Sequence, residues 1–158
     1  MDRQSWDDYF LGIAKAVAER STCDRGKNGA IIVVDKRIVT TGYAGSLPGM
    51  PHCDEVGHLM REVVDENGNK SRHCVRTIHA EKNAILQAAK YGISIKGGVL
   101  YCKMTPCLDC ATNIVMVGLV RVVAIRHYHA DGKSAELFKT AGVQLEVRED
   151  GIEEYKDQ

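Results

Sequence analysis

Four residues in two short motifs carry side chains that suit a metal ion and a proton-transfer group beside it: His79, Glu81, Cys107 and Cys110. An imidazole and two thiolates are ligands that zinc favours. Three protein ligands leave a fourth position open, which is typical of a catalytic zinc site. Glu81 lies two residues beyond His79, so the carboxylate can face a substrate as general acid and base while the imidazole binds the metal.

The spacing of these residues fits helix starts. Cys107 and Cys110 lie three apart and would share one face of a helix, whose positive end favours thiolates. Pro106 suits the first turn of a helix because it lacks an N–H. C-x-x-C alone is also typical of redox motifs and of structural zinc sites, and H-x-E alone says little. Together, in this order, they match the pattern of zinc-dependent deaminases.

Apolar periodicity predicts the elements that position these motifs. Helices are expected at residues 5–20, 79–91, 107–117 and 134–140. Strands are expected at residues 29–34, 37–41, 99–103, 120–125 and 143–147, the first two as a hairpin. Residues 42–70 have little regular pattern apart from a short helix around residues 55–64. The alternation predicts a three-layer α/β/α fold, with a mixed sheet of about five strands and helices on both faces.

Composition limits the classes of function. Lys plus Arg and Asp plus Glu number 21 each in 158 residues, so no broad basic surface for nucleic acid is expected. No apolar run approaches the ~20 residues of a membrane helix, and the polar start of the chain does not resemble a signal peptide. Six cysteines without an export signal favour reduced thiols in the cytoplasm over a disulfide scaffold.

Five segments resemble the deoxycytidylate (dCMP) deaminases, including bacterial competence-operon proteins of that group. They are residues 21–25 (STCDR), 42–49 (GYAGSLPG), 51–55 (PHCDE), 73–85 (HCVRTIHAEKNAI) and 106–110 (PCLDC). The resemblance covers nearly the whole chain and implies one deaminase domain over residues 1–158, with a cytidine-deaminase-like fold. It implies hydrolysis of dCMP to dUMP and ammonia, which feeds thymidylate synthesis. In that reaction Glu81 would transfer protons between water and the cytosine ring.

The resemblance also implies assembly and regulation. Members form homo-oligomers, often hexamers, and many respond to dCTP and dTTP at a glycine-rich loop. The matching positions here are Gly42, Tyr43, Gly45 and Gly49. Ala44 departs from the family pattern, since members usually carry an Asn there that contacts a nucleotide sugar, and this leaves sugar and effector recognition open. Asn28 departs as well, because the residue before Gly29 is usually apolar.

A second, structural zinc occurs in some members of the family. The residue types that suit it here are Cys23, His52, Cys53, His58, His73 and Cys74. Cys23, Cys53 and His73 match the family positions best, and the fourth ligand is open. The alternative is that these are unrelated buried thiols and surface imidazoles.

Three further residues are candidates for substrate binding. Arg25 and Lys27 precede the strand at residues 29–34 and could bind the 5′-phosphate, although a charged loop is more often simply solvated. Tyr128 follows the strand at residues 120–125 and resembles a residue near the substrate in the family, or is a sheet-end aromatic.

Rival functions remain open at this point. One is a deaminase of cytidine, guanine or tRNA adenosine. Another is a non-catalytic nucleotide-binding competence protein, and a third is a purely structural zinc protein. The last two have no use for an intact set of His79, Glu81, Cys107 and Cys110.

Overall fold

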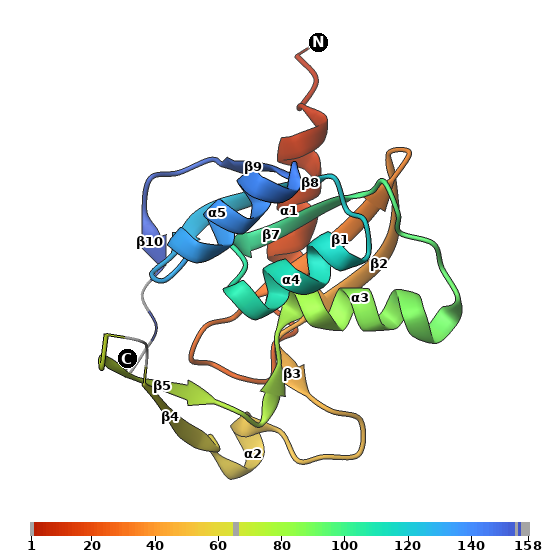
Figure 1. Ribbon diagram of the computed structural model, residues 1–158. Helices are drawn as coiled ribbons and strands as arrows, with labels where there is room; N and C mark the ends of the chain where they lie inside the picture. Colours follow the sequence, from red (N-terminus) through yellow and green to blue (C-terminus); the bar gives the residue numbers. More distant parts are fainter. Residues whose placement is uncertain (1, 65–66, 154, 156–158) are drawn as a thin grey trace.

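A central sheet separates two layers of helices (Figure 1). The computed structural model describes all residues except 1, 65–66, 154 and 156–158. Within that part the sheet has six strands: β1 (Gly29–Val34), β2 (Arg37–Tyr43), β7 (Val99–Met104), β8 (Arg121–Tyr128), β9 (Gln144–Val147) and β10 (Ile152–Glu153). Their order is β10-β8-β7-β1-β2, and β9 also pairs with β8. Strands β7 to β10 pair in parallel, whereas β1 is antiparallel to both neighbours. The predicted mixed sheet is therefore confirmed.

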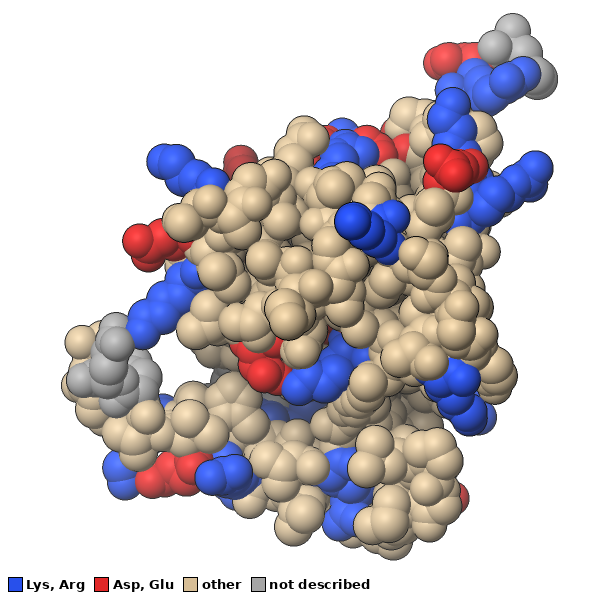
Figure 2. All heavy atoms as spheres, turned by 45° about the vertical axis from the view of Figure 1, so that its right-hand side comes forward, with Lys and Arg blue, Asp and Glu red and all other residues tan. Residues whose placement is uncertain are grey.

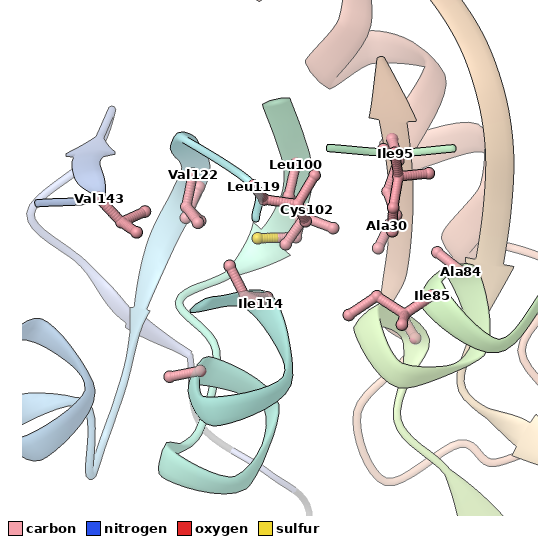
Figure 3. Close-up of a cluster of buried hydrophobic side chains, with 14 of the residues drawn as sticks. Ala30, Ala84, Ile85, Ile95, Leu100, Cys102, Ile114, Leu119, Val122 and Val143 are labelled. Carbon is pink, nitrogen blue, oxygen red and sulfur yellow. The ribbon is translucent and has the colours of Figure 1, made fainter. Parts of the chain in front are cut away.

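Helices cover both faces of this sheet, as predicted. Helix α1 (Trp6–Ala18) packs Phe10, Leu11 and Ala14 against one face. The other face is covered by α3 (Ala80–Tyr91), α4 (Leu108–Met116) and α5 (Gly132–Ala141). Their buried side chains meet those of the sheet in one apolar cluster, which includes Ala84, Ile85 and Ile114 (Figure 3). Burial of these apolar side chains on each side stabilises the three layers.

Local signals fix the ends of several elements. The Ser5 hydroxyl accepts a hydrogen bond from the Asp8 N–H at 3.1 Å and so caps α1. Asp35 and Lys36 both adopt positive φ, at 50° and 59°, which suits the two-residue turn of the β1–β2 hairpin. Gly92 ends α3 with φ of 63°, a left-handed conformation that glycine adopts without a steric penalty.

The segment between β2 and α3 differs from the sequence prediction. It contains β3 (Gly45–Ser46), the short α2 (Cys53–Val56), β4 (Met60–Val64), β5 (Lys70–Cys74) and β6 (Thr77–Ile78). The predicted helix around residues 55–64 is wrong, because β4 pairs antiparallel with β5. Four of the five β4 residues are exposed, so no apolar alternation marks this strand. The hairpin and α2 form a small lobe at one end of the molecule (Figure 1).

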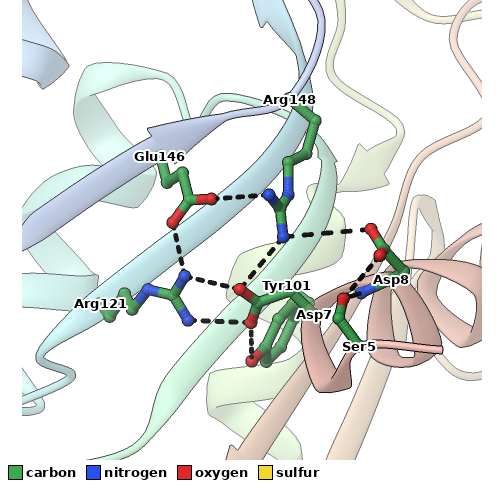
Figure 4. Close-up of polar contacts among 7 residues, drawn as sticks. All are labelled: Ser5, Asp7, Asp8, Tyr101, Arg121, Glu146 and Arg148. Atoms are coloured by element: carbon green, nitrogen blue, oxygen red, sulfur yellow. Dashed lines mark hydrogen bonds and ion pairs between the residues drawn. The ribbon is translucent and has the colours of Figure 1, made fainter. Parts of the chain in front are cut away.

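Asp7 ties α1 to the sheet through a network of charged groups (Figure 4). Its two carboxylate oxygens accept hydrogen bonds from both terminal nitrogens of Arg121, at 2.9 and 2.8 Å. The Tyr101 hydroxyl donates to the same carboxylate at 2.8 Å, and Arg148 does so at 3.1 Å. These contacts lower the pKa of Asp7, chiefly through the hydrogen bonds from Arg121. The network therefore holds the first helix against β7 and β8.

Candidate metal centre and active site

The three predicted zinc ligands come together at the start of two helices. His79 is the N-cap of α3, and Cys107 is the N-cap of α4. The His79 Nδ1 atom lies 3.4 Å from the Sγ atoms of both Cys107 and Cys110. All three donor atoms lie within 4.8 Å of one another. The sequence spacing of 28 residues between His79 and Cys107 is bridged by α3 and β7, which bring the two helix starts side by side.

The electrostatics of this group fit a divalent cation. Hydrogen bonding from Cys110 and the nearby His79 lower the pKa of Cys107 to about 4. The hydrogen bond that Cys110 donates to this thiolate raises the pKa of Cys110, as does burial; two adjacent anions would also repel each other. The contact with Cys107 also raises the pKa of His79 to about 9. A cation would offset the repulsion and release these protons on binding. One nitrogen and two sulfurs make a donor set that fits zinc with one position left for water.

Glu81 lies beside this donor set and is buried, with 2% of its surface exposed. Its Oε2 atom is 3.8 Å from Cys110 Sγ, and its Oε1 atom accepts a hydrogen bond from Asn28 Nδ2 at 3.1 Å. Burial raises the pKa of the Glu81 carboxyl, since a low-dielectric environment disfavours the charge. A carboxyl group in these surroundings is suited to taking up and releasing a proton.

A cavity opens onto these groups, and its lining includes His79, Glu81 and Cys107. Two of the three predicted substrate residues, Arg25 and Tyr128, also line it. Ala44, at the position where the family's Asn contacts a nucleotide sugar, lines it too. The lining also includes residues that were not singled out as substrate-binding from the sequence: Asn28, Arg72, His73, Met104, Thr105 and Tyr155. Tyr128 and Tyr155 contact each other edge to face, with ring centroids 6.1 Å apart. The cavity thus combines aromatic rings and cationic groups around the buried carboxyl.

Lys27 lies outside this cavity, in contrast to the sequence prediction. Its Nζ atom is 3.3 Å from the Glu19 carboxylate, and it lines a separate hollow with Lys103 and Arg126. Lys27 and Arg25 flank Gly26 in a loop before β1, and the path of this loop directs the two cations to different sides.

A second group of donors lies between the small lobe and the loop after α1. Cys23 Sγ is 3.6 Å from His58 Nδ1, and Cys53 Sγ is 3.6 Å from Cys74 Sγ. The four donor atoms all lie within 4.8 Å of one another. The second nitrogen of His58, Nε2, is 3.0 Å from Asp24 Oδ1, an arrangement common among metal-binding histidines. Three sulfurs and one nitrogen match a closed structural zinc site.

The thiols of this second group also suit a cation. Burial, together with the neighbouring thiols of Cys74 and Cys23, raises the pKa of Cys53 to about 12. Burial opposes ionisation of Cys74 too, but the backbone N–H groups of Arg76 and Leu59 donate to its sulfur and lower its pKa to about 7. Ionisation of all three sulfurs would therefore require a compensating positive charge.

His73 does not belong to this group, and the sequence prediction needs correction there. His73 and Cys74 are consecutive on β5, and successive side chains of a strand point to opposite faces. Cys74 joins the thiol group and also borders the cavity, whereas His73 borders the cavity alone, with its Nε2 atom 2.9 Å from the Ser71 hydroxyl. Cys23 and Cys53 are in the group as expected, and His58 and Cys74 complete it.

The predicted effector residues lie along the edge of the sheet next to α3. A Cβ atom at Gly42 would lie 2.3 Å from the Ala80 carbonyl oxygen, so only glycine permits this approach of β2 to α3. The Tyr43 carbonyl accepts a hydrogen bond from Asn83 Nδ2 at 3.0 Å. Gly45 pairs with Ile78 one residue before His79, and Gly49 follows in a turn with φ of 80°. Gly42, Tyr43 and Gly45 thus contact the start of α3 or the strand that leads into it; an effector role for the loop stays a prediction.

A family model described as the cytidine and deoxycytidylate deaminase zinc-binding region matches residues 4–126. The chain belongs to this family. Both motifs, with His79, Glu81, Cys107 and Cys110, fall inside the matched range. The resemblance that these motifs indicated is thus confirmed at the level of the family.

Sequence and structure comparisons with individual proteins support this assignment. The deaminase-family chain is 42% identical over 146 residues to ComE operon protein 2 of Bacillus subtilis, spanning 92% of this chain and 72% of that protein. It is 36% identical to deoxycytidylate deaminase of Schizosaccharomyces pombe, spanning 90% of this chain but 44% of the yeast protein. The crystal structure of dCMP deaminase from the cyanophage S-TIM5 in complex with dCMP and dUMP matches with a TM-score of 0.73 and 26% identity. That match covers 93% of this chain and 99% of the cyanophage chain.

Proposed function

We propose that the chain is a zinc-dependent deaminase that hydrolyses dCMP to dUMP and ammonia. The observation that carries the proposal is the buried Glu81 carboxyl, whose Oε2 atom lies 3.8 Å from a sulfur of the His79, Cys107 and Cys110 donor set. The names of similar proteins support the substrate, since a yeast relative is a deoxycytidylate deaminase and the matching cyanophage structure holds dCMP and dUMP.

Different residues around the cavity can carry out the different steps of this reaction. Zinc held by His79, Cys107 and Cys110 would lower the pKa of water towards neutrality and so supply a nucleophile. Glu81 takes one proton from water and delivers it to N3 of the cytosine ring, then takes the second proton from the oxygen added at C4 and delivers it to N4, which leaves as ammonia. Water adds at C4 and the C4–N4 bond breaks, which leaves the carbonyl of dUMP.

Cations at the cavity suit the phosphate of a nucleotide. The cations Arg25 and Arg72 line the cavity that also contains Glu81, and His73 lies with them as a neutral hydrogen-bonding group because burial lowers its pKa. Arginine matches phosphate geometry with paired hydrogen bonds. We infer that these residues bind the 5′-phosphate and favour dCMP over deoxycytidine. Lys27 has no part in this assignment because it lines another hollow.

An ammonia-release assay with zinc-loaded protein tests the proposed reaction. The expected result is turnover of dCMP, with much lower kcat/KM for deoxycytidine, CMP, guanine and adenosine. Turnover of one of these other compounds in preference to dCMP would contradict the substrate assignment. No turnover of any of them by protein with a full zinc content would contradict the enzymatic function.

The alternative of a tRNA deaminase receives little support from the surface. The chain has no net charge, and Figure 2 shows Lys and Arg side chains interspersed with Asp and Glu on the face that it presents. Nucleic-acid binding depends strongly on clustered Lys and Arg.

Among the described residues, no helix combines the length and apolar character that a membrane crossing requires.

The second group of donors supports a structural zinc as part of the proposal. Cys23, Cys53, His58 and Cys74 link the loop after α1 to α2, the segment after it and β5. The lobe that they belong to exposes several large apolar side chains, including Val56, Leu59 and Val64, so it has little core of its own. A metal bound by four side chains would stabilise the fold of this lobe, which apolar burial alone stabilises little.

Self-association is a further part of the proposal. Helices α3 and α4 contact each other and expose Leu86, Tyr91, Leu108 and Met116, of which Met116 is 87% exposed. Exposed apolar side chains on neighbouring helices are typical of protein interfaces. We infer that a homo-oligomer buries these side chains, and light scattering should give a mass of at least twice the 17.4 kDa of one chain. Assays with added dCTP and dTTP would test regulation at the Gly42–Gly49 loop.

A further inference from the structure

The side-chain amide of Asn28 is buried next to the candidate catalytic carboxyl of Glu81. Asn28 precedes β1 and is 7% exposed. Its Nδ2 atom donates a hydrogen bond to Glu81 Oε1 at 3.1 Å across 53 residues of sequence. A buried polar side chain in this position is costly unless its hydrogen bonds are satisfied, so the contact is a specific feature of the site.

The orientation of the Asn28 amide is fixed by a second contact. Its Oδ1 atom accepts a hydrogen bond from the Gly29 N–H at 3.0 Å. A backbone N–H can only donate, so the atom opposite it must be the oxygen, and the nitrogen must face Glu81. The Asn28 backbone is also held, because its carbonyl accepts from Ser21 Oγ and from the Ala44 N–H, both at 3.0 Å. The Asn28 NH₂ group that donates to Glu81 is therefore rigidly placed.

The two oxygens of Glu81 thus have different surroundings. Oε1 is held by Asn28, and Oε2 lies next to Cys110 Sγ. With one oxygen held, rotation of the carboxylate about its last bond is restricted, and Oε2 keeps its position beside the metal donors. Misplacement of a reacting group by about 1 Å can lower a rate by about a hundredfold.

We propose that Asn28 is a positioning residue for catalysis, which holds Glu81 so that its second oxygen exchanges protons at the metal centre. The kinetic test of this inference depends on the proposed function, whereas the structural test depends on geometry alone. The inference assigns a purpose to a buried polar residue that directly precedes the apolar strand β1.

The test compares Asn28→Leu with Asn28→Asp in zinc-loaded protein near pH 8. Leucine removes the donor and keeps the volume. Aspartate keeps the shape and the oxygen that accepts from Gly29, but it places an anion opposite Glu81. A positioning role predicts that kcat falls about ten- to hundredfold in Asn28→Leu, and at least as far in Asn28→Asp, while KM changes less than about threefold. A purely structural role predicts the reverse order, with the isosteric aspartate the milder change.

Ser21→Ala is the matched control, because it removes only one of the two hydrogen bonds to the Asn28 carbonyl; the bond from the Ala44 N–H and the contact with Glu81 both remain. Its kcat should stay within about twofold of the wild type, and all three variants should keep the zinc content of the wild type. Equal kcat in Asn28→Leu and the wild type would overturn the inference, as would a loss in kcat that Ser21→Ala reproduces.

A binding measurement gives a readout that does not depend on turnover. A dCMP analogue without the 4-amino group can take up water at C4 and so mimic the tetrahedral intermediate. Its affinity should fall about ten- to hundredfold in Asn28→Leu, while the affinity for dUMP stays within about threefold. Equal losses for both ligands would contradict the inference.

Crystal structures separate the two proposals. If the wild type binds zinc but does not turn over dCMP, the proposed function fails. The positioning role is then decided by structures of the zinc-loaded wild type and Asn28→Leu. The expected result is an Asn28–Glu81 hydrogen bond in the wild type and a rotated Glu81 carboxylate in the variant. An unchanged carboxylate in Asn28→Leu would overturn the inference whatever the substrate.

Discussion

Asp7 on α1 and Arg121 on β8 form a paired contact across 114 residues of sequence, with two hydrogen bonds of 2.9 and 2.8 Å. Both side chains are largely buried, with 20% and 22% of their surface exposed. Asp7→Asn should therefore lower the free energy of unfolding by about 1–3 kcal/mol. Chemical denaturation measures this change. Asp2→Asn is the control at an exposed position and should stay within about 0.5 kcal/mol of the wild type; equal effects of the two changes would contradict the assignment.

The same contact predicts how stability varies with pH. Hydrogen bonds from Arg121 lower the pKa of Asp7 below its ordinary value of 3.8. The ionised carboxylate therefore adds stability above the pKa of the unfolded chain, and this contribution is lost as the pH falls through the lower folded pKa. The difference in Tm between wild type and Asp7→Asn should be constant above about pH 5 and shrink below about pH 4. A difference that grows in acid would have the wrong sign.

Glu81→Gln should abolish most turnover while the metal stays bound. The amide keeps the shape of the side chain but cannot accept and return a proton, so kcat should fall by about 10²- to 10⁴-fold. Metal analysis should give the zinc content of the wild type, because Glu81 lies outside the His79, Cys107 and Cys110 donor set. Glu19→Gln, on an exposed carboxylate, controls for loss of charge. Undiminished activity in Glu81→Gln would exclude its role in proton transfer.

His58 and His73 make a matched pair for the second metal group. His58 Nδ1 lies 3.6 Å from Cys23 Sγ, whereas His73 is outside the group and lines the cavity. His58→Asn should lose about one zinc per chain after dialysis against a mild chelator, and His73→Asn should retain it. His73→Asn should instead raise KM for dCMP. The opposite pattern of metal loss would restore the ligand set that the sequence predicted.

Gly42→Ala should disturb the start of α3. The added Cβ would lie 2.3 Å from the Ala80 carbonyl oxygen and 2.4 Å from the Ala84 nitrogen, both backbone atoms that cannot easily move. A cost of about 1–3 kcal/mol is expected, together with weaker zinc binding at His79. Gly12→Ala is the control, since nothing lies within 4 Å of a Cβ there. In the interior of α1 it should stabilise the protein by about 0.5–1 kcal/mol, and thermal unfolding measures both changes.

The elements with strong local signals could be predicted from the sequence. The cap at Ser5, the turn at Asp35 and Lys36 and the glycine after α3 are all decided by neighbouring residues, and the structure contains each of them. The positions of the two site motifs could be predicted in the same way. His79 and Cys107 both stand at helix starts, where the predicted alternation of strands and helices put them.

Other features depend on contacts between distant segments. β4 has four exposed residues out of five, so its sequence shows no alternation of apolar and polar residues that would predict pairing with β5. The presence of Cys74 in the second group in place of His73 follows from the sides to which these two β5 residues point, and His58 joins the group from the segment between α2 and β4. The hydrogen bond between Asn28 and Glu81 spans 53 residues, and nothing near Asn28 in the sequence indicates its partner.

The adjacency of His73 and Cys74 on β5 has a practical consequence for biochemical work. One peptide unit connects the rim of the nucleotide cavity to the three-sulfur cluster, so a displacement of the strand at one is transmitted to the other. Protein purified from zinc-poor medium would then show two defects together, slow chemistry and weak capture of nucleotide. A stepwise metal titration, with kcat and KM followed separately, would resolve them where a single reconstituted sample would not.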